Sequence, residues 1–124
     1  MVKLFISSVQ REFETERREV AAYIRQDAVM GRFFEPFLFE ELPAKDVSAQ
    51  QAYLTEVAET KVYLGLFGVD YGYEDTEGIS PTEREYDCAT ENHKYRIVLS
   101  PLFLFWPSGS NWIQKGRYFI GRCA

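Results

Sequence analysis

Hydrophobic residues in the first 100 positions alternate between short continuous runs and stretches in which they recur at every third or fourth position. The continuous runs at Val2–Ile6 and Val62–Phe67 predict strands, and the second is apolar on both faces, as in a central strand. Phe33–Phe39 is rich in aromatic residues and predicts a strand whose Pro36 places it at a sheet edge with a bulge. Tyr95–Leu99 completes a set of four expected strands.

Apolar residues at helical spacing fill the intervals between these strands. We expect a surface helix from Val9 to about Gln26, a helix with Ser48 as N-cap that continues through Thr60, and a helix from Pro81 to about Asn92. The charged residues of the first helix are expected to form a solvated face with local ion pairs: Glu12, Glu14, Glu16, Arg17 and Arg18. Regular alternation of strands and helices predicts an α/β fold, with a parallel sheet, helices on both faces and right-handed crossovers.

The first turn of the last helix carries two glutamates, and helix capping separates their roles. Ser80 is the expected N-cap, Pro81 suits the first helical position, and Glu83 can complete a capping box with the N–H of Ser80. Glu85 has no such duty and shares a helical stripe with the small Ala89, which lets the helix approach the sheet. We therefore expect its carboxylate to point into the crevice at the carboxyl edge of the sheet, where open α/β folds bind ligands.

The first and third strands are expected to end near each other, close to the topological switch point of the sheet. Ser7 and Ser8 follow the first strand, and the loop 68–73 follows the third, so both should converge on Glu85. The two serines have two interpretations of equal weight. They bind the phosphate or ribose of a ligand, or they cap the helix that starts near Val9, and one serine could do each.

The loop after the third strand offers aromatic and acidic side chains to the same edge. Tyr71 and Tyr73 flank Gly72, a composition suited to stacking on a base, although covering the sheet edge is the commoner role for either ring alone. Among the acids of the loop, Asp70 is nearest to the strand end and is the candidate for proton transfer. The candidate catalytic residues are Glu85 and Asp70. The candidate ligand-binding residues are Ser7, Ser8, Phe67, Gly68, Tyr71, Gly72 and Thr82.

Composition and the absence of known motifs argue against several other classes of function. A chain of 124 residues fits one domain, and a net charge of −5 argues against nucleic-acid binding, which needs a basic face. Two cysteines and one histidine cannot supply a zinc site of the usual kind, so no metal and no cofactor are expected. The glycines match neither GxxxxGK[ST] nor GxGxxG. Without a signal-peptide pattern or a long apolar stretch, we expect a cytoplasmic protein with no membrane partner.

The last 24 residues depart from the pattern of the rest. All 19 acidic residues precede position 101, whereas residues 101–124 carry three basic residues and no acid. We therefore expect a domain over residues 1–100 and an atypical tail over residues 101–124. The tail either supplies a fifth strand at Arg117–Ile120, giving a sheet of four to five strands, or is an altered or truncated end of the natural domain.

Two long motifs carry a family resemblance. FISSVQREFETERREV at residues 5–20, followed by YLGLFGVDYGYEDTEGISPTEREYDCA at residues 63–89, resembles an uncharacterised domain at the N-terminus of bacterial and archaeal multidomain proteins, often ahead of NTPase modules. The resemblance covers about residues 2–99. It implies a three-layer flavodoxin-like fold related to Toll/interleukin-1 receptor (TIR) domains and to nucleoside 2-deoxyribosyltransferases.

The resemblance also implies a reaction and an alternative to it. Thr82, Glu85 and Ala89 match the spacing of the deoxyribosyltransferase motif, whose glutamate attacks the anomeric carbon of the sugar. By that resemblance the domain binds NAD or a related nucleoside and Glu85 serves cleavage of an N-glycosidic bond. The alternative is a non-catalytic module that self-associates as a homo-oligomer, with Glu85 hydrogen-bonded to Ser7 or Ser8. An open, polar pocket beside Glu85 favours the enzyme, and a filled crevice favours the module.

Overall fold

The computed structural model describes residues 1–41, 49–68 and 70–99 of the chain. Its elements, in chain order, are β1 (Val2–Ser8), α1 (Glu14–Gln26), α2 (Met30–Phe33), β2 (Phe34–Phe37), the short 3₁₀ helix η1 (Phe39–Glu41), α3 (Ala49–Glu59), β3 (Val62–Leu66), α4 (Pro81–Glu91) and β4 (Tyr95–Leu99). The expected N-cap at Ser48, the tail and its fifth strand at Arg117–Ile120 lie outside the described residues.

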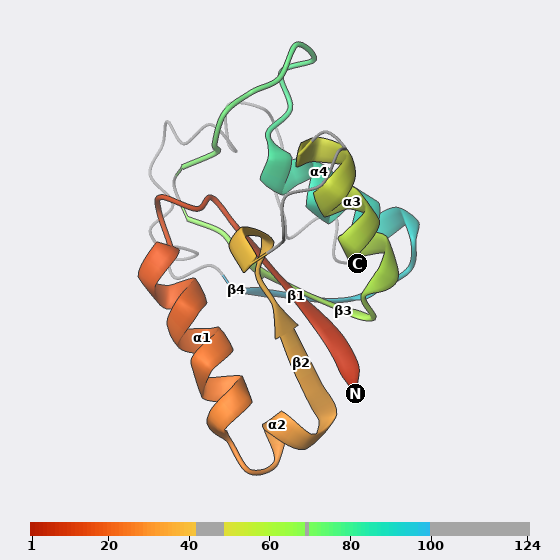
Figure 1. The fold of residues 1–124 in the computed structure, drawn as a ribbon. Coiled ribbons are helices and arrows are strands. Elements are labelled where there is room, and N and C mark those ends of the chain that lie inside the picture. Colours follow the sequence, from red (N-terminus) through yellow and green to blue (C-terminus); the bar gives the residue numbers. More distant parts are fainter. Residues whose placement is uncertain (42–48, 69, 100–124) are drawn as a thin grey trace.

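The four strands form one parallel sheet in the order β2-β1-β3-β4. Helices α1 and α2 cover one face and helices α3 and α4 the other, so the molecule has the three layers of an α/β fold (Figure 1). The edge position of β2 agrees with the expectation from Pro36. The expected bulge is absent from the described ladder, because residues 34–37 pair one to one with residues 2–5 of β1.

Side-chain alternation along β1 divides the interior into two clusters. Leu4 and Ile6 pack with Ala21 and Ile24 of α1 on one face of the sheet. Phe5 packs on the other face, in a cluster completed by Val57, Tyr63, Phe67, Tyr71, Tyr86 and Ala89. Ser7 has the same parity as Phe5, and side chains two residues apart in a strand point to the same face. The strand pattern therefore directs Ser7 toward α4 at the carboxyl end of the sheet.

The first helix begins later than its periodicity predicts, and this changes the interpretation of the serines. α1 starts at Glu14 with Phe13 as N-cap and without a side-chain capping bond. Ser7 and Ser8 are the last residues of β1, so neither caps this helix. No helix in the part of the chain that the structure describes has the length and apolar character needed to cross a membrane.

Candidate functional site

Glu85 and Ser7 meet where α4 begins above the end of β1. The Ser7 hydroxyl donates a hydrogen bond of 2.8 Å to Oε2 of Glu85, from a residue 78 positions away in the sequence. Both side chains are buried, with 7% of Glu85 and 1% of Ser7 exposed. The expected approach of the first strand end to the first turn of the last helix is therefore present. The small Ala89, one helical turn further on, is fully buried in the core beneath.

A cavity of about 410 Å³ opens beside this pair. Its lining residues are Ile6, Ser7, Ser8, Val9, Gln10, Arg11, Arg17, Phe39, Tyr53, Gly72, Tyr73, Pro81, Thr82 and Glu85. The volume lies in the range of pockets that hold small organic ligands, about 300 to 1,000 Å³. Of the expected site residues, the structure brings Ser7, Ser8, Gly72, Thr82 and Glu85 to this cavity. Asp70, Phe67, Gly68 and Tyr71 are not among its lining residues.

Burial changes the acidity of Glu85. Loss of hydration raises the pKa of its carboxyl to about 8, against the opposing effects of the Ser7 hydrogen bond and the positive charge of Arg17. Desolvation disfavours the charged form of a carboxyl group, whereas a hydrogen-bond donor and a nearby cation favour it. Glu85 therefore titrates close to neutral pH, and a carboxyl group with a shifted pKa in a cavity is typical of functional sites.

Arg17 was expected on a solvated helix face, and the structure contradicts this. Only 2% of the residue is exposed, and its Nη2 donates to Oε2 of Glu40 at 2.5 Å. Its Nε and Nη1 are buried and have no hydrogen-bond partner among the described residues. The sequence did hold a signal for this burial: Arg17 lies between Phe13 and Ala21 at intervals of four residues, on the apolar stripe of α1.

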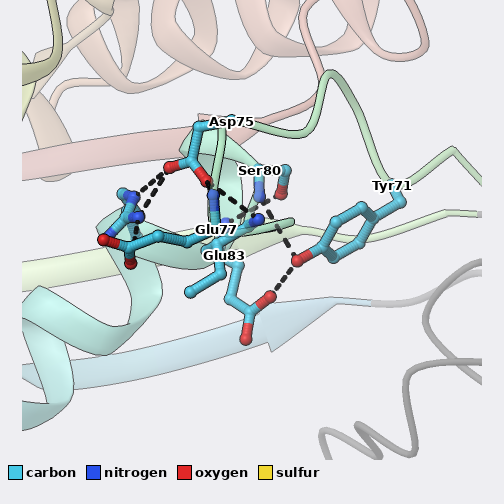
Figure 2. Close-up of polar contacts among 7 residues, drawn as sticks. Tyr71, Asp75, Glu77, Ser80 and Glu83 are labelled. Atoms are coloured by element: carbon cyan, nitrogen blue, oxygen red, sulfur yellow. Dashed lines mark hydrogen bonds and ion pairs between the residues drawn. The ribbon is translucent and has the colours of Figure 1, made fainter.

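Tyr71 is buried and is not among the residues that line the cavity. Its hydroxyl takes part in the cap of α4 (Figure 2). Ser80 accepts from the N–H of Glu83 at 3.3 Å, as the capping box predicts. The reciprocal bond differs from that motif. The N–H of Ser80 donates to the Tyr71 hydroxyl at 3.3 Å, and that hydroxyl in turn contacts Oε2 of Glu83 (Figure 2). A phenol from the preceding loop thus stands where a direct contact between Glu83 and Ser80 was expected.

Asp70, the second expected catalytic residue, fastens the loop to the start of the chain instead. Its carboxylate pairs with Nε of Arg11 at 2.8 Å and accepts from the N–H of Gly72, while its own N–H donates to Glu12 at 2.9 Å. The hydrogen bond from Arg11 lowers the pKa of the Asp70 carboxyl. A carboxyl group held ionised in this way is poorly suited to donate a proton, and Asp70 is not among the residues that line the cavity.

Phe67 and Gly68, two expected ligand-binding residues, contribute to packing and do not line the cavity. The ring of Phe67 packs edge-on against Tyr86, with ring centroids 6.0 Å apart, inside the core. A Cβ atom at Gly68 would lie 2.4 Å from Oε1 of Glu12, so a larger residue would displace the carboxylate that accepts from the N–H of Asp70. Both residues support the loop behind the site rather than line the cavity.

Three aromatic residues line the cavity: Phe39, Tyr53 and Tyr73. The sequence suggested stacking as one of two roles for Tyr73 and gave no indication for the other two. Tyr73 is exposed, and the guanidinium of Arg11 lies 4.7 Å from the centre of its ring. Phe39 and Tyr53 add an edge-on pair with centroids 5.8 Å apart. Burial raises the pKa of Tyr53 to about 12, so its hydroxyl stays protonated at neutral pH. Together these rings offer stacking surface to a planar ligand.

Comparisons with known proteins match this chain to a family and its fold to that of a solved structure. Residues 3–101 match the model of a family described as a domain of unknown function, DUF4062. A comparison with curated protein sequences gave no match. Among solved structures, the fold is similar to that of BcmB, a CMP N-glycosidase from Clostridium botulinum, with a TM-score of 0.51 and 13% sequence identity. The match covers 79% of this chain and 71% of that protein, and at this identity it establishes a shared fold.

Proposed function

The chain belongs to the DUF4062 family, whose domain has no assigned function, and we propose that it binds a nucleotide and cleaves its N-glycosidic bond through Glu85. One observation carries this proposal. The Glu85 carboxyl is buried at a cavity of small-ligand size, where Ser7 holds it by a hydrogen bond of 2.8 Å. A positioned carboxylate beside the anomeric carbon stabilises the positive charge that develops there when a glycosidic bond breaks.

The lining of the cavity bears on the leaving group. Glu85 supplies the one carboxyl group among the lining residues that the structure describes. A leaving group that is uncharged while bonded to the sugar would depart as an anion, and glycosidases avoid this by protonating it with a second carboxyl group. A cationic base such as nicotinamide leaves as a neutral molecule by taking the electron pair of the broken C1′–N bond, and it needs no proton. NAD or a related nicotinamide nucleotide is therefore the substrate that this lining suits best.

The proposed reaction consumes one water molecule. The C1′–N bond breaks, and the Glu85 carboxylate either forms a C1′–O ester or stabilises the sugar cation. Water then attacks C1′ and, where the ester has formed, breaks the C1′–O bond to release the Glu85 carboxylate. The water oxygen stays on C1′, and one proton goes to solvent or to Glu85. The products are the free base and the sugar with a 1′-hydroxyl group. The shared fold with a CMP N-glycosidase supports this reaction class.

The test is release of free base from a panel of NAD, nicotinamide mononucleotide, CMP and unphosphorylated nucleosides. We expect wild-type protein to turn over at least one member, and we expect Glu85→Gln to lose about 1,000-fold or more in rate, the scale of losing a nucleophile. Glu83→Gln removes a carboxylate from the same helical turn and should stay within about tenfold of wild type. Equal rates in Glu85→Gln and wild type would disprove the role of Glu85.

The pH dependence of the same rate gives a second readout. A nucleophilic carboxylate must be ionised, and the pKa of Glu85 is raised to about 8 by burial. We therefore expect kcat/KM to rise with pH and to level off above about pH 8. A rate that falls over this range would instead assign Glu85 the role of a proton donor.

A second candidate function is supported by two observations. Ser7 satisfies one oxygen of Glu85 within the chain, as the interaction module predicts. In addition, Tyr95, Ile97 and Leu99 of β4 expose a row of apolar side chains on the face shared with α1. If the domain self-associates as a homo-oligomer through this row, light scattering should give an oligomeric mass for wild type and a monomeric mass for Ile97→Lys. No turnover together with that result would favour the module.

A further inference from the structure

We propose that Arg17 binds a phosphate group, so that the ligand of this cavity is a 5′-phosphorylated nucleotide and not a free nucleoside. The inference deepens the proposed function, because it concerns the ligand of the same cavity, and it rests on a residue to which no role has been assigned. Its basis is a buried guanidinium with unused hydrogen-bond donors at the wall of a pocket that also holds Glu85.

The guanidinium of Arg17 is deeply buried yet incompletely used. Arg17 is 2% exposed, and Nη2 is bound to Glu40. Nε and Nη1 carry donors with no hydrogen-bond partner in the part of the chain that the structure describes. Because buried polar groups in native proteins are nearly always hydrogen-bonded, unused donors on a residue that lines a cavity call for an acceptor. An acceptor from a bound ligand would satisfy them.

The chemistry of the wall favours an oxyanion as that acceptor. A guanidinium is always charged and is the side chain best suited to recognise phosphate oxygens. The first turn of α4, with Pro81 and Thr82, lines the same cavity, and the positive end of a helix dipole also favours an anion. Thr82 and Ser8 add hydroxyl groups to the lining. Arg11, the other arginine of the lining, is already paired with Asp70.

Glu40 makes the proposal sharply testable, because it competes for the same guanidinium. If Arg17 only supports the fold through this ion pair, removing either partner should weaken ligand binding or leave it unchanged. If Arg17 binds phosphate, removing the carboxylate leaves its positive charge unbalanced and should strengthen anion binding. Arg17→Gln and Glu40→Gln are then expected to act in opposite directions.

The experiment is calorimetric titration of the full chain with ribose 5-phosphate and with ribose. Neither sugar contains an N-glycosidic bond, so the result does not depend on turnover. We expect ribose 5-phosphate to bind at least about tenfold more tightly than ribose to wild type. Arg17→Gln should abolish this difference and Glu40→Gln should enlarge it. Arg18→Gln is the matched control, because Arg18 is exposed and pairs with Glu14 on the outer surface of α1.

Each result bears on the proposal. Equal affinity for the two sugars, a difference that survives in Arg17→Gln, or unchanged or weaker binding of the phosphate in Glu40→Gln would overturn it. If circular dichroism shows that Arg17→Gln does not fold, Glu40→Gln decides the question alone. Turnover in the nucleotide panel without any preference for ribose 5-phosphate would refute the phosphate site and keep the proposed function. A preference for ribose 5-phosphate without turnover of any nucleotide would support the phosphate site and refute the proposed cleavage reaction.

Discussion

Glu83 and Glu85 lie two residues apart in the first turn of α4, both are buried, and their surroundings differ completely. Glu83 faces the core side of the preceding loop, where the Tyr71 hydroxyl contacts it and the Ser80 side chain caps its backbone (Figure 2). Glu85 faces the end of β1 and the cavity, where Ser7 is its partner. A rotation of about 200° around the helix axis separates the two positions.

The difference between these glutamates shows how a single helical turn can serve the fold and a binding site together. The core-facing side of the turn fixes where α4 begins. That anchoring determines the height of Glu85 above the sheet, since the two residues share one rigid backbone segment. The site therefore depends on the cap of α4, although Tyr71, Ser80 and Glu83, which form that cap, do not line the cavity.

The largest expected effect that separates the two glutamates in the folded protein is on the pH dependence of stability. Glu85 has a folded pKa of about 8, raised from 4.5 mainly by burial, so the folded state binds a proton that the unfolded state releases between these values. Wild type should therefore lose stability relative to Glu85→Gln as the pH rises from about 4.5 to 8, by a few kcal/mol in all. Urea unfolding at several pH values measures this difference.

The control for that measurement is Glu16→Gln, which removes one carboxyl group from the exposed surface of α1. A stability difference between wild type and Glu85→Gln that stays constant between pH 4.5 and 8 would contradict the raised pKa. It would also remove the electrostatic contrast between the two glutamates.

The second largest expected effect is the loss of stability when the Tyr71 hydroxyl, which contacts Glu83, is removed. Tyr71→Phe removes a donor to Glu83 and the acceptor for the N–H of Ser80, both in the core. Losing a buried hydrogen-bond partner costs about 1 to 3 kcal/mol, so the free energy of unfolding should fall by this amount. Tyr23→Phe, which changes an exposed tyrosine of α1, should have no measurable effect. Wild-type stability in Tyr71→Phe would mean that the cap does not depend on this hydroxyl.

The smallest expected effect sharpens the other side of the comparison. The Ser7 hydroxyl stabilises the ionised form of Glu85, so Ser7→Ala should raise the pKa of Glu85 further above 8. A hydrogen bond worth about 1 kcal/mol corresponds to somewhat less than one pKa unit. Carboxyl-carbon NMR titration measures the shift. Ser8→Ala is the control, because the Ser8 hydroxyl contacts the Val9 carbonyl and not Glu85. A lower pKa in Ser7→Ala would contradict the assigned hydrogen bond.

The parts of the site that the sequence predicted are those that depend on strand order and helical spacing. Alternating strands and helices imply a parallel sheet, and in such a sheet the ends of β1 and β3 are neighbours. Helical spacing then places Glu85 over Ser7. Both inferences use local patterns plus one topological rule, and the contact between residues 7 and 85 agrees with them.

The parts that the sequence did not predict depend on partners far away in the chain. Asp70 is a free acid until Arg11, 59 residues away, is brought beside it. Arg17 has the charge of a surface residue, and its burial requires Glu40 from η1 as a partner. Tyr71 has a ring suited to stacking on a ligand, but its hydroxyl group instead bridges the N–H of Ser80 and the carboxylate of Glu83. In each case residue type suggests exposure and a long-range contact overrides it.

The fastening of the loop between β3 and α4 has a consequence for how a ligand would bind. Arg11 and Glu12, which lie outside the loop, form hydrogen bonds with Asp70. On the core side, the Tyr71 hydroxyl accepts a hydrogen bond from the N–H of Ser80 at the other end of the loop. Restricting the backbone of one residue costs about 1 to 2 kcal/mol in conformational entropy. Because the loop backbone is already ordered in the folded protein, a ligand that binds beside Gly72 and Tyr73 contacts a preorganised surface. Its affinity can then derive from contacts alone, with little entropy lost to ordering the protein.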